Sequence, residues 1–298
     1  MEQTESLWLG ILFAVIASTN MNVGKGVQKW KVEVFAQKMG MFKKEHIGDL
    51  GVWLIGMALT ASCVPLFSFA MKFTDKTSLV SSLNGIGMIF LVVFAWVVLK
   101  EKVGIQELAG AFLVLAGTAL VNYFDRPTPQ EAFSVFRFAS ASGAMIVFFT
   151  GLAIYSWKTG RLYGFSFGAL PGIFIGTGMI LGDVALVESN NDMLGQLLTP
   201  YPYFAFLVAI GALVVTQIAF WRARAMVVVP TINSFVIVSP LVMEYFTFGT
   251  VLLPVQYAGV AAIVAGVIML TYTDAQDRIE GVHEDLVEDA FHELESPD

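Results

Sequence analysis

Long apolar runs separated by short polar segments dominate this chain. Between consecutive charged residues, 19 uncharged residues separate Glu5 from Lys25, and 22 separate Asp49 from Lys72. A helix needs about 20 mostly apolar residues to cross the hydrocarbon core of a bilayer, and barrel strands are much shorter. The pattern therefore predicts nine membrane-spanning helices, at residues 6–28, 49–71, 78–99, 104–123, 134–157, 162–187, 203–221, 228–248 and 255–273.

Composition excludes the main soluble classes. Of the 298 residues, 56% are hydrophobic and 14% charged, whereas soluble domains carry about 45–50% and 25%. The single cysteine, Cys63, rules out an intrachain disulfide framework. There is no phosphate-binding loop motif, and the three histidines lie outside the spans. We therefore expect no enzyme activity, no cofactor and no nucleic-acid partner. Membrane lipid is the expected environment, and anionic lipid is the expected partner of the basic segment 25–44.

The basic residues predict an orientation. With the N-terminus outside, 13 Lys and Arg residues fall on the cytoplasmic side of the nine spans and 4 on the outside, as the positive-inside rule requires. The negative net charge comes from residues 274–298, which hold ten acids and one Arg. We expect an acidic cytoplasmic tail and a location in the plasma (inner) membrane.

An internal repeat links the third and fourth spans to the last two. At an offset of 149 residues, Asn84 aligns with Asn233, and Ala109-Gly110 and Ala116-Gly117 align with Ala258-Gly259 and Ala265-Gly266. The paired spans are five apart, so the two copies cross the membrane in opposite senses, as in the inverted repeats of secondary transporters. Val23-Gly24-Lys25 in the first span has a weaker counterpart in Leu181-Gly182-Asp183 in the sixth.

These observations predict one fold class and one division of the chain. We expect an all-α integral membrane protein with an inverted repeat of four helices, a linker helix and four helices. The transmembrane domain covers residues 1–273, with repeat one at 6–123, the linker span at 134–157 and repeat two at 162–273.

Several motifs of the first half resemble a known superfamily. Leu79-Val80-Ser81-Ser82-Leu83, then Leu99-Lys100-Glu101-Lys102-Val103 and Ala109-Gly110 resemble the first-half signature of EamA-like members of the drug/metabolite transporter superfamily. The first span, with its polar residues and the charged loop that follows, is most similar to the nine-span NIPA-type magnesium transporters. The resemblance implies a transporter, with Mg²⁺ as the cargo in that branch. Two departures bear on the cargo: Ser82 stands where the NIPA-type motif has Pro, and Gly249-Thr250 stands where Lys100-Glu101 would repeat.

Ionisable residues inside spans are rare and are candidates for function. Glu244 and Asp183 lie toward the outer ends of the eighth and sixth spans, and they are the possible metal ligands. Lys25 lies near the cytoplasmic end of the first span, where a snorkelling side chain is the alternative interpretation.

Four further positions complete the set of candidates. The repeat-related Asn84 and Asn233 could face a solute pathway or simply bond neighbouring helices. Asn20 and Asn22 are two residues apart in a helix and cannot both face the same direction. We expect one of them to face the solute pathway, and Asn20 is the candidate. Lys100-Glu101 marks a cytoplasmic helix end.

Three functions remain open at this stage. The first is a secondary transporter that moves a small solute by alternating access, with Mg²⁺ or another divalent cation as one possible cargo. The second is the same fold carrying a small organic metabolite or drug. The third is a non-transporting membrane scaffold with an acidic docking tail. A homodimer is possible in each case.

Overall fold

The computed structural model describes residues 2–32, 47–73, 82–125, 133–190, 192 and 194–273. The described residues form helices joined by turns and contain no β-strand. The helices are α1 (Glu2–Trp30), α2 (Ile47–Lys72), the 3-10 helix η2 (Leu83–Gly85), α4 (Gly87–Val97), α5 (Ile105–Tyr123), α6 (Val135–Thr159), α7 (Tyr163–Glu188), the 3-10 helix η3 (Gly195–Leu198), α8 (Tyr201–Arg222), α9 (Ala225–Phe248) and a last helix, Pro254–Thr273.

Eight of these helices are long and apolar enough to cross a membrane. They agree with eight of the nine predicted spans to within a few residues, which confirms the all-α membrane class. The third predicted span, 78–99, is shorter than expected. It is seen as a broken helix from Leu83 to Val97, and residues 78–81 lie outside the described part. The predicted acidic tail, 274–298, also lies outside it.

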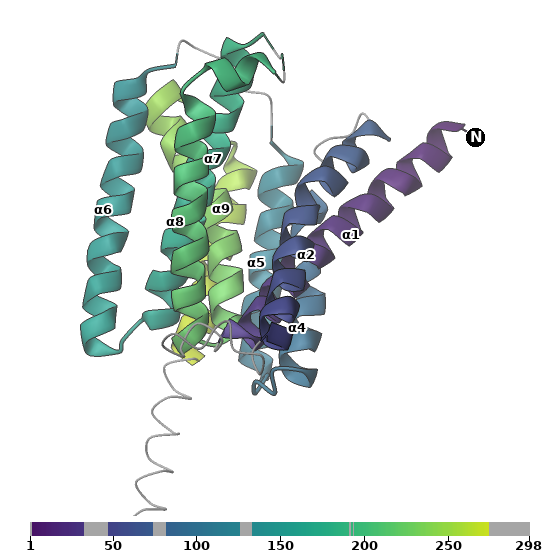
Figure 1. Cartoon of the computed structure of the whole chain (residues 1–298), viewed down its shortest axis with the longest axis vertical. Helices are drawn as coiled ribbons and strands as arrows, with labels where there is room; N and C mark the ends of the chain where they lie inside the picture. The colour runs from purple at the N-terminus through teal and green to yellow at the C-terminus, as the bar shows by residue number, and fades with distance from the viewer. Residues whose placement is uncertain are drawn as a thin grey trace, which may run out of the picture.

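The helices form two groups that lie side by side. Figure 1 shows α1, α2, α4 and α5 in one group and α6, α7, α8 and α9 in the other. Within the groups, α1 packs on α2 and α4, and α7 packs in the same way on α8 and α9. Helix α6 contacts α7 and α9 and lies at the outer edge of its group (Figure 1). The division of the chain into two four-helix repeats and a linker helix stays a prediction.

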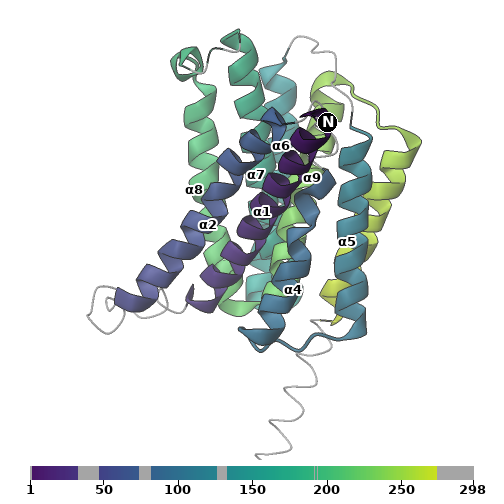
Figure 2. The same cartoon turned by 90° about the vertical axis from the view of Figure 1, so that its right-hand side faces the viewer.

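Helix α5 and the last helix join the two groups through four glycines. A Cβ at Gly110 would lie 3.0 Å from the carbonyl oxygen of Gly266, and one at Gly259 would lie 3.0 Å from that of Gly117. In the reverse direction, a Cβ at Gly117 would lie 2.5 Å from the carbonyl oxygen of Gly259, and a Cβ at Gly266 would lie 2.5 Å from that of Gly110. The two helices are antiparallel, since Gly110 meets Gly266 and Gly117 meets Gly259. Adding 149 to the numbers of Gly110 and Gly117 gives Gly259 and Gly266, so the offset converts each contact into the other. A pseudo-twofold axis therefore passes between these helices. Figure 2 shows the two helices next to each other.

The two halves also repeat their local backbone devices. Lys100 and Gly249, one offset apart, both adopt a left-handed conformation, with φ of 57° and 72°. The side chain of Glu107 accepts a hydrogen bond from the Gly104 N–H at 2.9 Å, and that of Gln256 accepts one from the Leu253 N–H at 2.9 Å. Each device closes the first turn of its helix.

The weaker match between the first and sixth spans aligns differently in space. Gly24 packs tightly on Gly56 and Thr60 of α2, whereas a Cβ at Gly182 would meet nothing within 4 Å. The glycine of α7 that faces α8 is Gly178. The packing at Gly24 is thus not repeated at Gly182, and the match between the two segments stays a prediction from the sequence.

Candidate functional site

A buried lysine joins the two halves in the interior of the bundle. The Nζ of Lys25 in α1 donates to the Oδ1 of Asn233 in α9 at 2.7 Å. The Nδ2 of Asn233 in turn donates to the Oδ1 of Asn22 in α1 at 2.7 Å. Asn22 and Lys25 are three residues apart and therefore share a helix face. The exposed fractions are 6% for Lys25, 8% for Asn233 and 0% for Asn22, so this contact is shielded from the surroundings.

The contact continues toward the broken third span. Asn22 donates to the carbonyl oxygen of Ser18 at 2.9 Å. The Ser18 hydroxyl donates to the carbonyl of Asn84 and accepts from the N–H of Gly87. A Cβ at Gly87 would overlap the Ser18 carbonyl, so glycine is required where α1 crosses this helix. The break in the third span thus brings its backbone polar groups to α1.

A second polar chain links α1 to α2 and α8. Gln28 donates to Thr60 at 2.9 Å and accepts from Gln217 at 2.9 Å. Gln217 also accepts a hydrogen bond: the indole N–H of Trp53 donates to its Oε1 at 2.9 Å. Sequence reasoning missed these residues. The available signal was the presence of glutamine at two positions inside otherwise apolar spans.

Within the described ranges, the Lys25 ammonium has one hydrogen-bond partner and no carboxylate at ion-pair distance. An ammonium group has three donors, and an uncompensated charge in a low-dielectric interior is costly. The site is therefore suited to receive an additional hydrogen-bond acceptor or an anionic group. A bare divalent cation placed beside it would be repelled.

The predicted acidic residues lie elsewhere. Glu244 in α9 is half-buried, and Asp183 in α7 is exposed. The two carboxylates interact electrostatically. Asp125, just after α5, also interacts with Glu244. Among the described residues, no three acidic, histidine or cysteine side chains come together closely enough to hold a metal ion. The structure thus brings Glu244 and Asp183 near each other without forming a chelating site.

The remaining predicted residues take separate positions. Asn20 is half-buried and donates to Ser62 at 3.0 Å, so Asn22 is the buried member of that pair. The side-chain oxygen of Asn84 is buried and has no hydrogen-bond partner within the described ranges. Asn84 and Asn233 are therefore related by the repeat but differ in their contacts.

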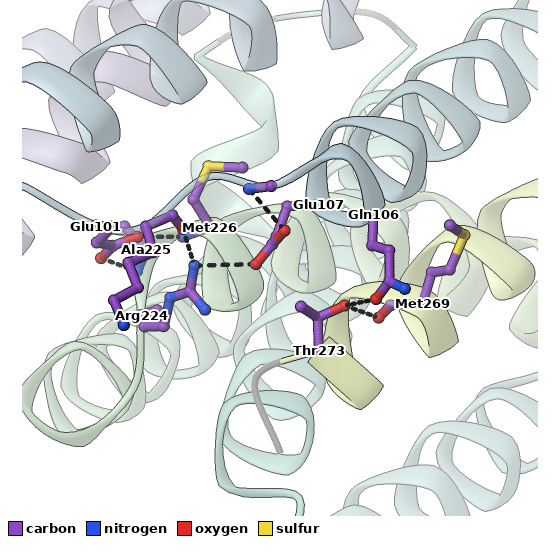
Figure 3. A network of polar contacts seen from close by, with 10 residues as sticks. Glu101, Gln106, Glu107, Arg224, Ala225, Met226, Met269 and Thr273 are labelled. Carbon is purple, nitrogen blue, oxygen red and sulfur yellow. Dashed lines mark hydrogen bonds and ion pairs between the residues drawn. The ribbon is translucent and has the colours of Figure 1, made fainter. Parts of the chain in front are cut away.

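Within the Lys100-Glu101 pair, the side chain of Glu101 forms part of a contact between the halves at the end of the bundle. The carboxylate of Glu101 accepts from the N–H groups of Ala225 and Met226 at 2.7 and 3.1 Å, at the N-terminus of α9, where negative charge is favoured. Arg224 bonds the side chain of Glu107 at 3.3 Å. Figure 3 shows these residues together. We call the Glu101–α9 and Arg224–Glu107 contacts the latch. Burial raises the pKa of Glu101, while the two N–H donors and the nearby Lys29 and Arg224 oppose that shift.

Comparison with known proteins finds a family that part of the chain resembles. No curated protein and no solved structure matches the chain significantly. The model of the EamA-like transporter family matches residues 34–123, a region that contains α2, α4 and α5 of the first half. Residues 34–123 of this integral membrane chain are thus similar to the EamA-like transporter family.

Proposed function

We propose that the chain is a secondary transporter that moves a small solute by alternating access between two inverted four-helix repeats, 6–123 and 162–273. The observation that carries this proposal is the buried contact of Lys25 and Asn22 with Asn233, because it places polar and charged groups at the junction of the halves. Secondary transporters hold their solute at such a junction. A scaffold with no cargo has no use for an uncompensated buried charge there.

The solute that fits this site is a small organic molecule with an acceptor or anionic group. Such a group would bind the donors of Lys25 and the asparagine amides, and it would offset the cost of burying the ammonium. Mg²⁺ prefers oxygen ligands, carboxylates above all, and no carboxylate of the described residues lies at ion-pair distance from Lys25. The NIPA-type branch and its Mg²⁺ cargo are thus less well supported than an organic solute.

A divalent cation is the second candidate, and one observation favours it. Glu244, Asp183 and Asp125 interact at the end of the bundle away from the latch. Carboxylates gathered at one mouth would raise the local concentration of a cation there. In this alternative, Glu244 and Asp183 would meet the ion first.

The latch supplies a mechanism for closing one side. It joins Glu101 and Glu107 of the first half to the start of α9 in the second half. Opening it would separate the halves at this end, and solute binding at Lys25 would shift the balance between the two states. By the distribution of Lys and Arg, we place the latch on the cytoplasmic side and the N-terminus outside, in the plasma membrane.

Uptake by purified protein in liposomes tests the function. We expect saturable uptake of one or more solutes from a panel of organic acids, amino acids and sugar phosphates, and its loss in Lys25→Met. Lys31→Met is the matched control, because Lys31 pairs with Asp49 at the surface. Uptake of Mg²⁺ alone, unaffected by Lys25→Met, would contradict the organic-solute assignment but not transport. No uptake of any offered solute or ion, with correctly folded protein, would count against transport itself.

A further inference from the structure

The side of α9 that faces the first half changes from buried to partly exposed at Asn233. Met226, Val229 and Asn233 follow one another at helical spacing on this side, and their exposed fractions are 0%, 0% and 8%. Ile237 and Glu244 continue the same side toward the end of the helix away from the latch, and both are partly exposed. Because the change occurs along one face of one helix, it reflects what lies opposite that face.

Helix α1 shows the same change on the face opposite. Asn22, which bonds Asn233, is completely buried. Val15 and Ile11 lie two and three turns further along the same face and are partly exposed, and Trp8 beyond them is 67% exposed. Figure 1 shows α1 leaning away from α9 toward its N-terminus. The two halves therefore diverge on this side of the contact between Asn22 and Asn233.

On the other side of that contact, the halves are held together. Gln28 of α1 accepts a hydrogen bond from Gln217 of α8, and Glu101 accepts from the start of α9 in the latch. Leu91 of α4 and Val229 of α9 belong to one apolar cluster and are 1% and 0% exposed. Hydrogen bonds and apolar packing thus close the path from Asn233 to the latch.

Water suits the open side better than lipid does. Glu244 is an ionisable residue within a span, and such residues face the bundle interior or a water-filled cavity. Lys25 and Asn233 lie at the inner end of this side, where hydrocarbon chains would solvate neither group. The walls between the two ends are apolar and include Ile237 and Val15.

We propose that these facing sides of α9 and α1 line an aqueous entry route, open at the end of the bundle away from the latch. The route stops one helical turn short of the contact between Lys25 and Asn233. From Glu244 to Asn233 it spans about three turns, or roughly 16 Å. Apolar walls and a cationic inner end suit an organic anion with an apolar remainder. The assignment rests on the proposed function, because it takes Lys25 as the solute site, but water access is measured without any solute.

A charged thiol reagent tests the route in full-length protein. Single-cysteine variants in a Cys63→Ser background are placed in nanodiscs, which expose both ends of the bundle, and treated with sulfonatoethyl methanethiosulfonate. We expect Ile237→Cys and Val15→Cys to react and the buried Val229→Cys to stay unmodified. Val147→Cys is the control for lipid exposure. Val147 is 72% exposed in the middle of α6 at the outer edge of its group (Figure 1), so lipid covers it and the reagent should not reach it.

The charge of the reagent tests the inner end of the route. We compare the rate of the sulfonate with that of the trimethylammonium analogue at Ile237→Cys. The ammonium of Lys25 attracts the anion and repels the cation, so Lys25→Met should lower this ratio by about fivefold or more. Lys31→Met should leave the ratio unchanged, because Lys31 pairs with Asp49 at the surface. If Ile237→Cys misfolds, Val15→Cys serves for the same comparison.

Two results would overturn the proposal. One is reaction at Ile237→Cys and Val15→Cys no faster than at Val147→Cys or Val229→Cys. The other is an unchanged charge ratio in Lys25→Met. Neither result bears on uptake by proteoliposomes, which tests transport. A reactive route in a protein that takes up no solute would instead count against transport and leave the route in place.

Discussion

Lys25 in α1 and Asn233 in α9 are 208 positions apart in the chain, and their side chains form a 2.7 Å hydrogen bond in the interior. The bond joins a cation to a neutral amide and leaves the cation without a described counter-ion. Its two partners come from opposite halves of the repeat, so any movement of one half relative to the other must break it or carry it along.

A double-mutant cycle measures this bond. Asn233→Leu leaves the buried ammonium without its acceptor, and we expect it to destabilise the protein by about 1–3 kcal/mol or more. Lys25→Met should cost less, because it removes the charge. The double variant should be more stable than the sum of the singles predicts, by about 0.5–3 kcal/mol. Thermal unfolding in detergent provides the measurement. Additive effects would show that the two side chains are not coupled.

Substitution at the glycine crossing should be severe. Gly117→Ala places a Cβ 2.5 Å from the carbonyl of Gly259, and a backbone atom cannot rotate away as a side chain can. We expect a clear loss of thermal stability and of monodisperse protein on size-exclusion chromatography. Gly143→Ala in α6 is the control, because its Cβ would meet nothing within 4 Å and alanine favours a helix. A Gly117→Ala variant as stable as this control would contradict the close contact.

Neutralising the outer acids separates the two candidate cargoes. If the solute is organic and binds at Lys25, Glu244→Gln and Asp183→Asn should express normally and retain uptake within about threefold, a change of less than 1 kcal/mol. Lys25→Met should abolish uptake in the same assay. The reverse result, with weakened apparent affinity in the Glu244 and Asp183 variants and normal uptake in Lys25→Met, would favour a cation.

The latch should make stability depend on pH. Burial raises the pKa of Glu101 in the folded protein above its ordinary value of 4.5. The folded state therefore holds this proton to higher pH than the unfolded state, and stability from this group falls as pH rises through the folded pKa. As the pH is raised from 4.5, the melting temperature of the wild type should fall relative to that of Glu101→Gln. A difference that stays constant with pH would argue against a buried carboxyl.

Labelling of single cysteines tests the orientation. In a Cys63→Ser background, we expect Leu198→Cys to react with an impermeant maleimide added to intact cells, since Leu198 is 91% exposed near the end of the bundle away from the latch. Thr159 is exposed at the C-terminal end of α6, on the side of the bundle opposite to Leu198, so Thr159→Cys should react only after lysis. Labelling of Thr159→Cys in intact cells would reverse the proposed topology.

Much of the fold follows from the sequence because membrane spans are long and their boundaries are charged. Eight predicted spans are confirmed, and the 149-residue offset places glycines that do meet in space. The third span differs because Gly87 lets its backbone approach Ser18 closely, a tertiary effect that hydropathy does not register. The weak match of the first and sixth spans consists of one apolar residue, one glycine and one charged residue, which is too short to fix the packing, and Gly24 and Gly182 have different surroundings.

The site was less accessible to sequence reasoning. Lys25 and Asn233 could be picked out as polar residues within spans, but nothing local indicates that they bond each other. Glu244 and Asp183 could be picked out as carboxylates within spans, but Glu244 interacts electrostatically with Asp183 and Asp125 and takes no part in the described hydrogen bonds of the buried polar chain. Hydrogen bonds such as that from Gln217 to Gln28 depend on which helices become neighbours, and only the fold decides that.

The paired helix starts at Gly104 and Leu253 have a consequence for how the chain enters the membrane. The same backbone device carries Glu107 at one end and Gln256 at the other, and Lys100-Glu101 corresponds to Gly249-Thr250. The two ends thus share their geometry and differ in charge. A framework with this symmetry could insert into the membrane in either orientation. The charged member of each pair, Glu107 and Lys100-Glu101, must therefore determine which side faces the cytoplasm. Divergence between the repeats would then have fixed a direction in a protein whose framework alone has none.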